Sequence, residues 1–269
     1  MRKLTSPPLL MVLALLLAAC GGGDGGGAAP PPSSSFKTRV PGVLTVGTEL
    51  PNPPFVLGED LDNLQGGYEV DLVDEIARRL DIATVAWVNV PFNGLVAGAP
   101  CPCDFDVNGV SILPARQQLL DFSASYFTAN QGVLVRKGTK VAGVAGARRL
   151  RFGVQKGSSG ALYLEATLRP ERNPRAFDST TAALLALAAG QVEAVISDVP
   201  IVLDGARQHR SLEVVGQFKT EEQYGAVLAK GSPNTRPLSE VIDRLRSEGV
   251  LDRLYRRYFP EQVRIPTLR

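Results

Sequence analysis

The chain has 269 residues, with 29 Lys and Arg against 27 Asp and Glu, and a formal net charge of +2 at pH 7. Two of the basic residues, Arg2 and Lys3, lie at the amino terminus, so the rest of the chain carries 27 of each sign. Nucleic-acid binding relies on clustered positive charge, and this balance therefore argues against nucleic acid as a partner. One histidine, His209, and three cysteines are too few for a zinc site, so neither a metal nor another cofactor is expected.

The amino terminus has the order of a secretory signal, which we assign to residues 1–19. Arg2 and Lys3 precede an apolar run, Leu9 to Ala18, that is shorter than the ~20 residues needed to span a bilayer. The signal ends in Leu-Ala-Ala-Cys, which resembles a bacterial lipobox and implies cleavage before Cys20 and lipid on its sulfur. Residues 20–36, nearly all Gly, Ala, Pro and Ser, are then expected to form a flexible tether to the membrane.

Strand and helix patterns alternate in the first part of the remaining chain. Leu44 to Thr48 predicts a buried strand, and a proline-rich loop follows it. Apolar residues at helical spacing predict a helix over 69–80, and strands are expected over 83–90 and 105–112. Such alternation is typical of a largely parallel sheet with helices on its faces.

A second alternation begins near residue 151. Strands are expected over 151–154, 193–196 and 224–229, and helices over 161–168, 180–189 and, split near Gly249, 237–258. The restart predicts an α/β fold with two lobes. Residues 37–134 and 226–269 are assigned to lobe 1, and 135–225 to lobe 2.

Polar side chains follow several of these strands. Ser111 and Arg116 stand at and beyond the carboxyl end of the strand over 105–112, where a guanidinium can bind a carboxylate. Ser158 precedes a helix, where it can cap the helix or help form an anion site. Asp198, before Val199-Pro200, fits equally well as a helix cap and as a group that holds a cation.

Cys101 and Cys103 remain once Cys20 is lipidated. An even pair in an exported protein suggests a disulfide. One intervening residue makes a tight ring, however, so the pair can also stay reduced.

Together the segments resemble the family 3 solute-binding proteins of ABC transporters, which capture polar amino acids outside the cytoplasmic membrane. The resemblance covers about residues 43–260. The motifs that carry it are Val46-Gly47-Thr48-Glu49, Pro53-Pro54-Phe55, Gly67 to Leu72, Phe92 to Leu95, Phe105-Asp106, Gly109 to Arg116, Asp121 to Ser123, Phe152 to Ser158, Val192 to Asp198, Tyr224-Gly225 and Leu251 to Tyr255.

The resemblance implies a type II periplasmic-binding-protein fold, in which two lobes clasp the ligand and two strands, here near 133–136 and 224–229, form the hinge. Arg116 would bind the α-carboxylate of an amino acid, with help from Ser111 and from N–H groups at Ser158 and Ser159. Asp198 and the Gly109 carbonyl would hold the α-ammonium. Phe55 and Phe92 would flank the ligand side chain.

Glu49 follows a strand in the place where the family commonly has an acidic residue facing the ligand side chain. No Arg or Lys occurs from 45 to 77 to neutralise an acidic ligand, so basic amino acids and glutamine are expected to bind ahead of aspartate and glutamate, with arginine first. Two departures from the family stand out. The stretch 98–104 interrupts a helix expected after Phe92, and Asn52 stands where an aromatic residue is common.

The expected function is that of a non-catalytic, monomeric receptor that delivers its amino acid to an ABC permease while a lipid holds it at the membrane. An enzyme on the same scaffold, such as a dehydratase or a peptidoglycan lyase, is the main alternative, since Glu49 or Asp198 could act as general acid or base. One histidine and these cysteines provide neither a Ser-His-Asp nor a Cys-His set. A ligand-sensing module is the third possibility.

Overall fold

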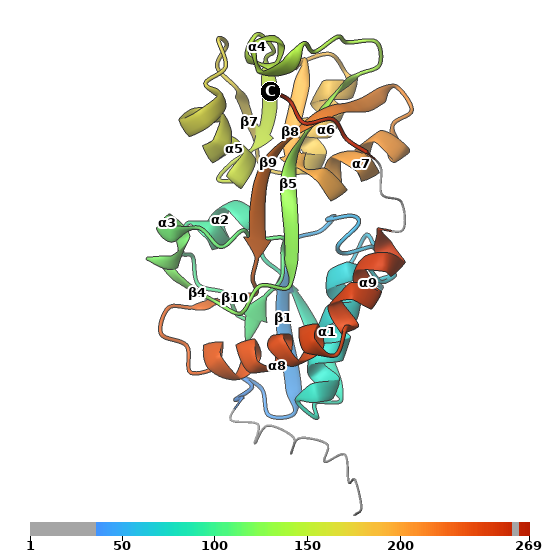
Figure 1. Cartoon of the computed structure of the whole chain (residues 1–269). Helices are drawn as coiled ribbons and strands as arrows, with labels where there is room; N and C mark the ends of the chain where they lie inside the picture. The colour runs from blue at the N-terminus through green and yellow to red at the C-terminus, as the bar shows by residue number, and fades with distance from the viewer. Residues whose placement is uncertain (1–35, 260–263) are drawn as a thin grey trace, which may run out of the picture. The chain divides into compact units, whose positions relative to one another are not determined.

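The computed structural model describes residues 36–259 and 264–269, and builds them around two five-stranded sheets, one in each lobe (Figure 1). The expected signal over 1–19, Cys20 and all of the tether except residue 36 lie outside the described residues. Within the described part of the chain, every helix is too short or too polar to cross a membrane.

The first lobe is built on a sheet with the strand order β2-β1-β3-β10-β4. Its first three strands are parallel, and β10 runs antiparallel to both of its neighbours. The strands are β1 Val43–Thr48, β2 Thr84–Asn89, β3 Phe105–Asp106, β4 Leu120–Phe122 and β10 Val227–Ala229. The helices of this lobe are α1 Tyr68–Arg79, α2 Phe92–Val96, α3 Pro114–Gln117, α8 Thr235–Ser247 and α9 Val250–Tyr258.

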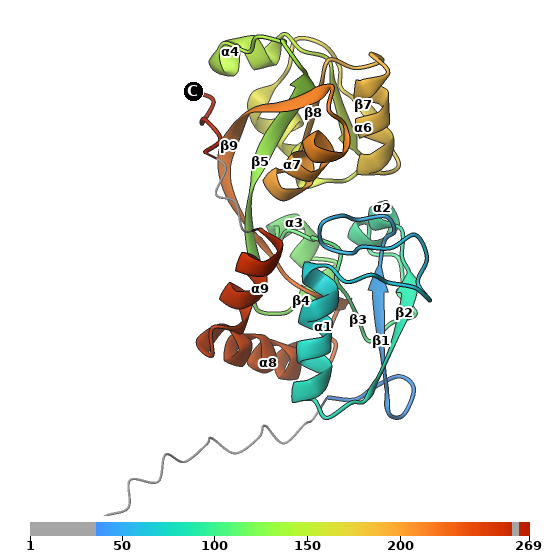
Figure 2. The same cartoon turned by 90° about the vertical axis from the view of Figure 1, so that its right-hand side faces the viewer.

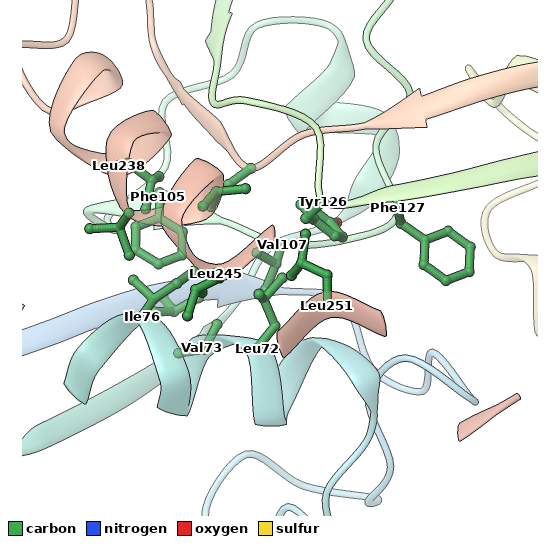
Figure 3. Close-up of a cluster of buried hydrophobic side chains, with 14 of the residues drawn as sticks. Leu72, Val73, Ile76, Phe105, Val107, Tyr126, Phe127, Leu238, Leu245 and Leu251 are labelled. Carbon is green, nitrogen blue, oxygen red and sulfur yellow. The ribbon is translucent and has the colours of Figure 1, made fainter. Parts of the chain in front are cut away.

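Helix α1 forms because its apolar residues recur every three to four positions, so they share one face of a helix. Leu72, Val73 and Ile76 on that face are fully buried. They pack against Phe105 from the sheet and Leu245 from α8 (Figure 3). Helices α1, α8 and α9 contact one another, as Figure 2 shows, and so cover one face of the first sheet.

The second lobe has the strand order β7-β6-β8-β5-β9. Strands β6, β7 and β8 are parallel, whereas β5 is antiparallel to β8 and β9. The strands are β5 Phe127–Arg136, β6 Phe152–Gln155, β7 Arg175–Phe177, β8 Ala194–Asp198 and β9 Leu212–Tyr224. The helices are α4 Gly143–Arg148, α5 Ser159–Tyr163, its π-helical continuation η1 Leu164–Leu168, α6 Thr180–Ala188 and α7 Val199–Gln208.

The predicted α/β fold with two lobes and mostly parallel sheets is confirmed, and each sheet contains one strand, β10 or β5, that runs opposite to the rest. Two strand predictions were wrong in extent. The strand expected over 105–112 ends at Asp106, because the chain turns at Gly109, whose φ of +58° lies in the left-handed region that favours glycine. The strand expected over 224–229 is two strands, and its first part belongs to the long β9, which sequence reasoning missed.

The connection between the lobes also differs from the prediction. Strands β5 and β9 pair along their length and link the two sheets (Figure 1). The chain leaves the first sheet after β4, and residues 127–134, assigned to lobe 1, pair as part of β5 in the second sheet, although the Phe127 ring packs into the core of the first lobe. The stretch 133–136, predicted as a hinge strand, lies well inside this sheet.

The carboxyl-terminal residues 264–269 were assigned to lobe 1, but they pack against lobe 2. Leu268 is buried in a hydrophobic core of the second lobe and donates its N–H to the Gln217 carbonyl at 2.9 Å. Thr267 pairs with Gln217 as an isolated parallel bridge, and Val144 donates to the Arg269 carbonyl. The segment docks here because Leu268 can bury its apolar side chain and because β9, at the edge of its sheet, has backbone groups free to pair.

Candidate functional site

A pocket lies where strands from both sheets end. Strands β1 and β3 of the first lobe and β6 and β8 of the second lead into loops or helices whose first residues face it. This is the edge at which open α/β sheets bind ligands. The lining residues are Glu49, Pro51, Asn52, Phe92, Asn108, Gly109, Gln155, Ser158, Ser159, Thr180, Ser197, Asp198 and Ile201.

Arg116 lies beside this pocket in the short helix α3, not directly at a strand end as predicted. Its side chain is buried, and it donates to the Ser111 carbonyl at 2.9 Å and to the Gly157 carbonyl of the other lobe at 2.9 Å. The guanidinium lies 5.6 Å from the centre of the Phe92 ring, within cation–π range. Burial lowers the pKa of Arg116, while the charges of Glu222 and Asp198 oppose that change.

Gly109 and Ser111 are held in place by the chain between β3 and α3. The buried Glu69 carboxylate accepts a hydrogen bond from the Gly109 N–H at 2.8 Å and another from the Tyr126 hydroxyl. Ser111 forms an isolated bridge with Tyr224 instead of ending a strand. A buried acid of α1 therefore fixes the loop that brings Gly109 to the pocket.

Ser158 is the cap of helix α5, because its hydroxyl accepts from the Ala161 N–H at 3.1 Å. The capping interpretation is confirmed, and it is compatible with the anion site because both Ser158 and Ser159 line the pocket. A helix start exposes N–H groups that suit a carboxylate.

Asp198 occupies the cap position of α7, yet its side chain makes no capping hydrogen bond. Its Oδ1 accepts instead from the Gln131 amide at 2.6 Å. Burial raises the pKa of Asp198 to about 7, with a further contribution from Glu222, while hydrogen bonding and the Arg116 charge oppose the rise. Of the two interpretations that the sequence left open, the geometry favours a carboxylate that faces the pocket.

Glu49 is also turned into the pocket and not to solvent. Its Oε1 accepts from the Phe92 N–H at 3.1 Å, and its Oε2 accepts from the Gln155 amide at 2.9 Å. Thr180 donates to the other end of that amide, at 2.9 Å, which fixes its orientation. Burial raises the pKa of Glu49, and the two hydrogen bonds oppose the rise.

Phe55 does not lie where it was predicted. Its ring is fully buried among aromatic residues of the first lobe, with its centre 5.2 Å from that of Phe127 and 5.7 Å from that of Tyr224. Phe92, by contrast, lines the pocket. The proline-rich loop turns Phe55 toward the core, and Asn52 of the same loop faces the pocket in its place.

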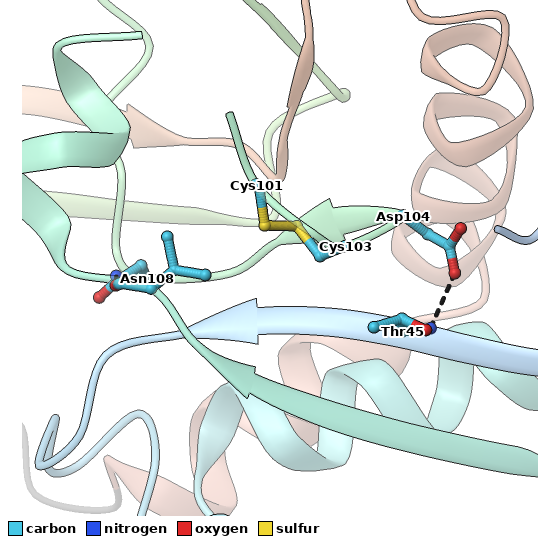
Figure 4. Close-up of a disulfide and its surroundings, with 6 residues drawn as sticks. Thr45, Cys101, Cys103, Asp104 and Asn108 are labelled. Carbon is cyan, nitrogen blue, oxygen red and sulfur yellow. Dashed lines mark hydrogen bonds between the residues drawn. A yellow bond between two sulfur atoms is a disulfide. The ribbon is translucent and has the colours of Figure 1, made fainter. Parts of the chain in front are cut away.

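Cys101 and Cys103 are joined by a disulfide (Figure 4), which selects one of the two states that the sequence left open. Directly after it, the Asp104 carboxylate accepts from the Thr45 N–H at 2.7 Å and so ties this loop to β1. Helix α2 ends at Val96, in agreement with the predicted interruption by residues 98–104. Among the described residues no group of three or more His, Cys, Asp or Glu could hold a metal ion.

Sequence reasoning missed three residues of this site. Gln155 orients Glu49, Gln131 orients Asp198, and Glu222 contacts both Gln131 and Ser111. Gln155 could have been noticed because it follows a strand directly. Gln131 and Glu222 lie within long strands, and only the pairing of those strands brings them together behind Asp198.

Residues 44–261 match the model of the bacterial extracellular solute-binding proteins, family 3, and the chain belongs to that family. Its fold is the type II periplasmic-binding-protein fold predicted from the sequence. A relative named as a probable histidine-binding protein, from Neisseria gonorrhoeae, is 28% identical over 78% of this chain and 82% of its own length.

Two solved structures are similar over most of the chain. The chain matches an ancestral arginine-binding protein bound to arginine with a TM-score of 0.73 and 27% identity, over 81% of this chain and 98% of that one. It matches an ancestral amino acid-binding protein described as a precursor of cyclohexadienyl dehydratase with a TM-score of 0.71 and 25% identity, over 81% and 95%.

Proposed function

We propose that this protein is the substrate-binding component of an ABC transporter and captures a polar amino acid, preferably a basic one, for delivery to a permease. The observation that carries this proposal is the placement of opposite charges at one pocket and its edge. Arg116 and the start of α5 offer donors to a carboxylate, whereas Asp198 offers an acceptor to an ammonium group. An amino-acid zwitterion needs both, and the names of the similar proteins point to the same kind of ligand.

Glu49 supports the preference for a basic side chain. Glu49 lines the pocket from the first lobe, whereas Asp198 lines it from the second. Its two hydrogen-bond partners, the Phe92 N–H and the Gln155 amide, are uncharged groups. A carboxylate without a neutralising cation attracts a guanidinium or ammonium group and repels a second carboxylate. We therefore expect arginine, lysine, histidine or glutamine to bind ahead of aspartate and glutamate.

A thermal-shift panel tests this ligand class. A ligand at 100 times its dissociation constant stabilises a protein by ~2.7 kcal/mol, which for a chain of this size is a rise in Tm of roughly 5–10 °C. The largest rise is expected with arginine. If aspartate or glutamate gave the largest rise and arginine and glutamine gave none, the role of Glu49 would be refuted.

Arg116→Ala tests the binding site itself. Removal of one partner of a desolvated charge pair costs ~2–5 kcal/mol, which is a loss of affinity of about 30-fold to several thousand-fold. Calorimetry with the amino acid that gives the largest thermal shift measures the loss. Lys156→Ala, which removes an exposed cationic side chain paired with Asp178, outside the residues that line the pocket, is the matched control and should bind normally.

A catalytic role is the alternative, because a similar structure is described as the precursor of a dehydratase and because Glu49 and Asp198 both have raised pKa values. We propose that the protein is a receptor and not an enzyme. Mass spectrometry of each amino acid in the panel, before and after prolonged incubation with the protein, separates the two. An unchanged mass is expected, and a product would establish the enzyme.

The lipid anchor is part of the proposal. The Leu-Ala-Ala-Cys motif supports a diacylglycerol on Cys20, with the globular part outside the cytoplasmic membrane. Cys20→Ala should move the protein from the membrane fraction to the soluble fraction. Continued sedimentation of this variant with membranes would argue against the anchor.

We also propose a monomer, which light scattering of the unanchored chain can test.

A further inference from the structure

Glu222 is a half-buried carboxylate of strand β9 that reaches the binding site from behind. Its Oε2 accepts from the Ser111 hydroxyl at 2.6 Å, and its Oε1 accepts from the Gln131 amide at 2.9 Å. The preceding residue, Glu221, is exposed. Glu221 has a φ of +50°, in the left-handed region, and the pairing of β9 with β5 shifts register beside it. Of these two side chains, Glu222 is the one that contacts residues of the site.

Gln131 connects Glu222 to Asp198. It is fully buried, and the nitrogen that donates to Glu222 also donates to Asp198 at 2.6 Å. The same nitrogen also lies 3.2 Å from the Ser159 hydroxyl oxygen, so its two N–H groups are shared among the two carboxylates and this hydroxyl. The reversed amide would point its oxygen at two acids. The orientation is therefore fixed by them, although it leaves the Gln131 carbonyl, within the described structure, without a hydrogen-bond partner.

Several charged or titratable groups face Asp198. Arg116 approaches from α3, and Glu222 and the Tyr224 hydroxyl approach from β9. Burial raises the pKa of Asp198 and the like charge of Glu222 raises it further, whereas hydrogen bonds from Tyr224 and Gln131 and the charge of Arg116 lower it. A protonated Asp198 loses its charge–charge attraction for an ammonium group, so protons and ligand compete for it.

We propose that Glu222 is a positioning residue for Asp198: through Gln131 it orients the Asp198 carboxylate toward the ligand ammonium, and its charge determines how sensitive ligand binding is to acid. This inference rests on the proposed function, because it deepens the account of the same ammonium site. Glu222 itself does not line the pocket, so it acts on the ligand through Gln131 and Asp198.

The test is a calorimetric titration from pH 5 to pH 8 with the best ligand of a panel of L-arginine, L-lysine, L-histidine and L-glutamine. With Asp198 titrating at about 7, affinity should fall about 100-fold from pH 8 to pH 5 in the unmodified protein, because each pH unit below the pKa costs a factor of ten. Asp198→Asn should bind weakly at every pH. This result would show that the loss of affinity at low pH comes from protonation of Asp198.

Glu222→Gln keeps an acceptor for Ser111 and removes the charge. At pH 8 we expect it to bind about threefold more weakly than the unmodified protein. Its fall in affinity from pH 8 to pH 5 should be smaller than that of the unmodified protein by a factor of roughly three or more, because the like charge beside Asp198 is gone. Glu222→Ala provides a second charge-removing variant if Gln distorts the strand. Glu221→Gln, one residue away and exposed, is the matched control and should follow the unmodified protein.

The outcomes separate the two proposals. If the unmodified protein binds no member of the panel at any pH, the proposed function fails. If it binds a ligand and its affinity falls toward pH 5 to the same extent in both Glu222 variants, the proposed function stands and the role of Glu222 is refuted. A smaller loss at low pH in the Glu222 variants, with the Glu221 control unaffected, supports the inference.

Discussion

Replacement of Glu69 by Gln should change how stability depends on pH. The Glu69 side chain is fully buried, and burial raises its pKa from 4.5 to about 7, against the opposing hydrogen bonds from Tyr126 and Gly109. The unfolded chain loses this proton near pH ~4.3, while the folded protein keeps it up to about 7. The folded state is therefore destabilised as pH rises through that window, and at ~1.4 kcal/mol per pKa unit the full shift costs about 3.5–4 kcal/mol.

Glutamine cannot titrate in this range, and its carbonyl can accept the same two hydrogen bonds. Asp106 is also fully buried, and its pKa is raised by burial and by the like charge of Glu69. Glu69→Gln removes that like charge, which likewise makes the folded state less sensitive to rising pH. The stability of Glu69→Gln relative to the unmodified protein should therefore improve by roughly 2–3 kcal/mol or more between pH 5 and pH 8.

Urea unfolding at pH 5, 6, 7 and 8 measures this difference without ligand. Comparison at each pH cancels the contributions of carboxyl groups that both proteins share. Glu59→Gln, which changes an exposed acid of the same lobe, should show no such trend. A stability difference between Glu69→Gln and the unmodified protein that stays constant from pH 5 to pH 8 would refute the reasoning.

Two further predictions concern the carboxyl-terminal segment and the disulfide. Leu268→Ala should cost ~2–4 kcal/mol in urea unfolding, because this buried side chain completes the core of the second lobe, whereas Leu119→Ala, at a position 53% exposed, should cost under ~1 kcal/mol. A negligible effect at Leu268 would mean that the carboxyl-terminal segment is not docked in solution. Reduction of the disulfide between Cys101 and Cys103 should cost under ~2 kcal/mol, since a ring with a sequence separation of 2 restricts the unfolded chain little. Unfolding with and without dithiothreitol measures this, and a loss twice as large would show that the bond does more than close a short ring.

Local sequence patterns correctly predicted most of the regular elements. The helices α1, α6, α8 and α9 and the strands β1, β2, β6 and β8 fall within a few residues of their predicted positions. These elements have a clear apolar period or a strong cap, so their neighbours in sequence decide their structure. The motifs around Glu49, Arg116 and Asp198 likewise indicated the family, and the structure brings these residues to one pocket or its edge.

Only the tertiary structure decided which polar groups serve that pocket and which apolar groups serve the core. Phe55 and Asn52 lie in one proline-rich loop, and the local sequence does not say which of them turns inward. Gln131 and Glu222 lie 91 residues apart. They meet because β5 and β9 pair, and the register of strands distant in sequence depends on burial and hydrogen bonding along their whole length. The same holds for Leu268, whose place in the second lobe depends on a free edge of β9 that exists only once the sheet has formed.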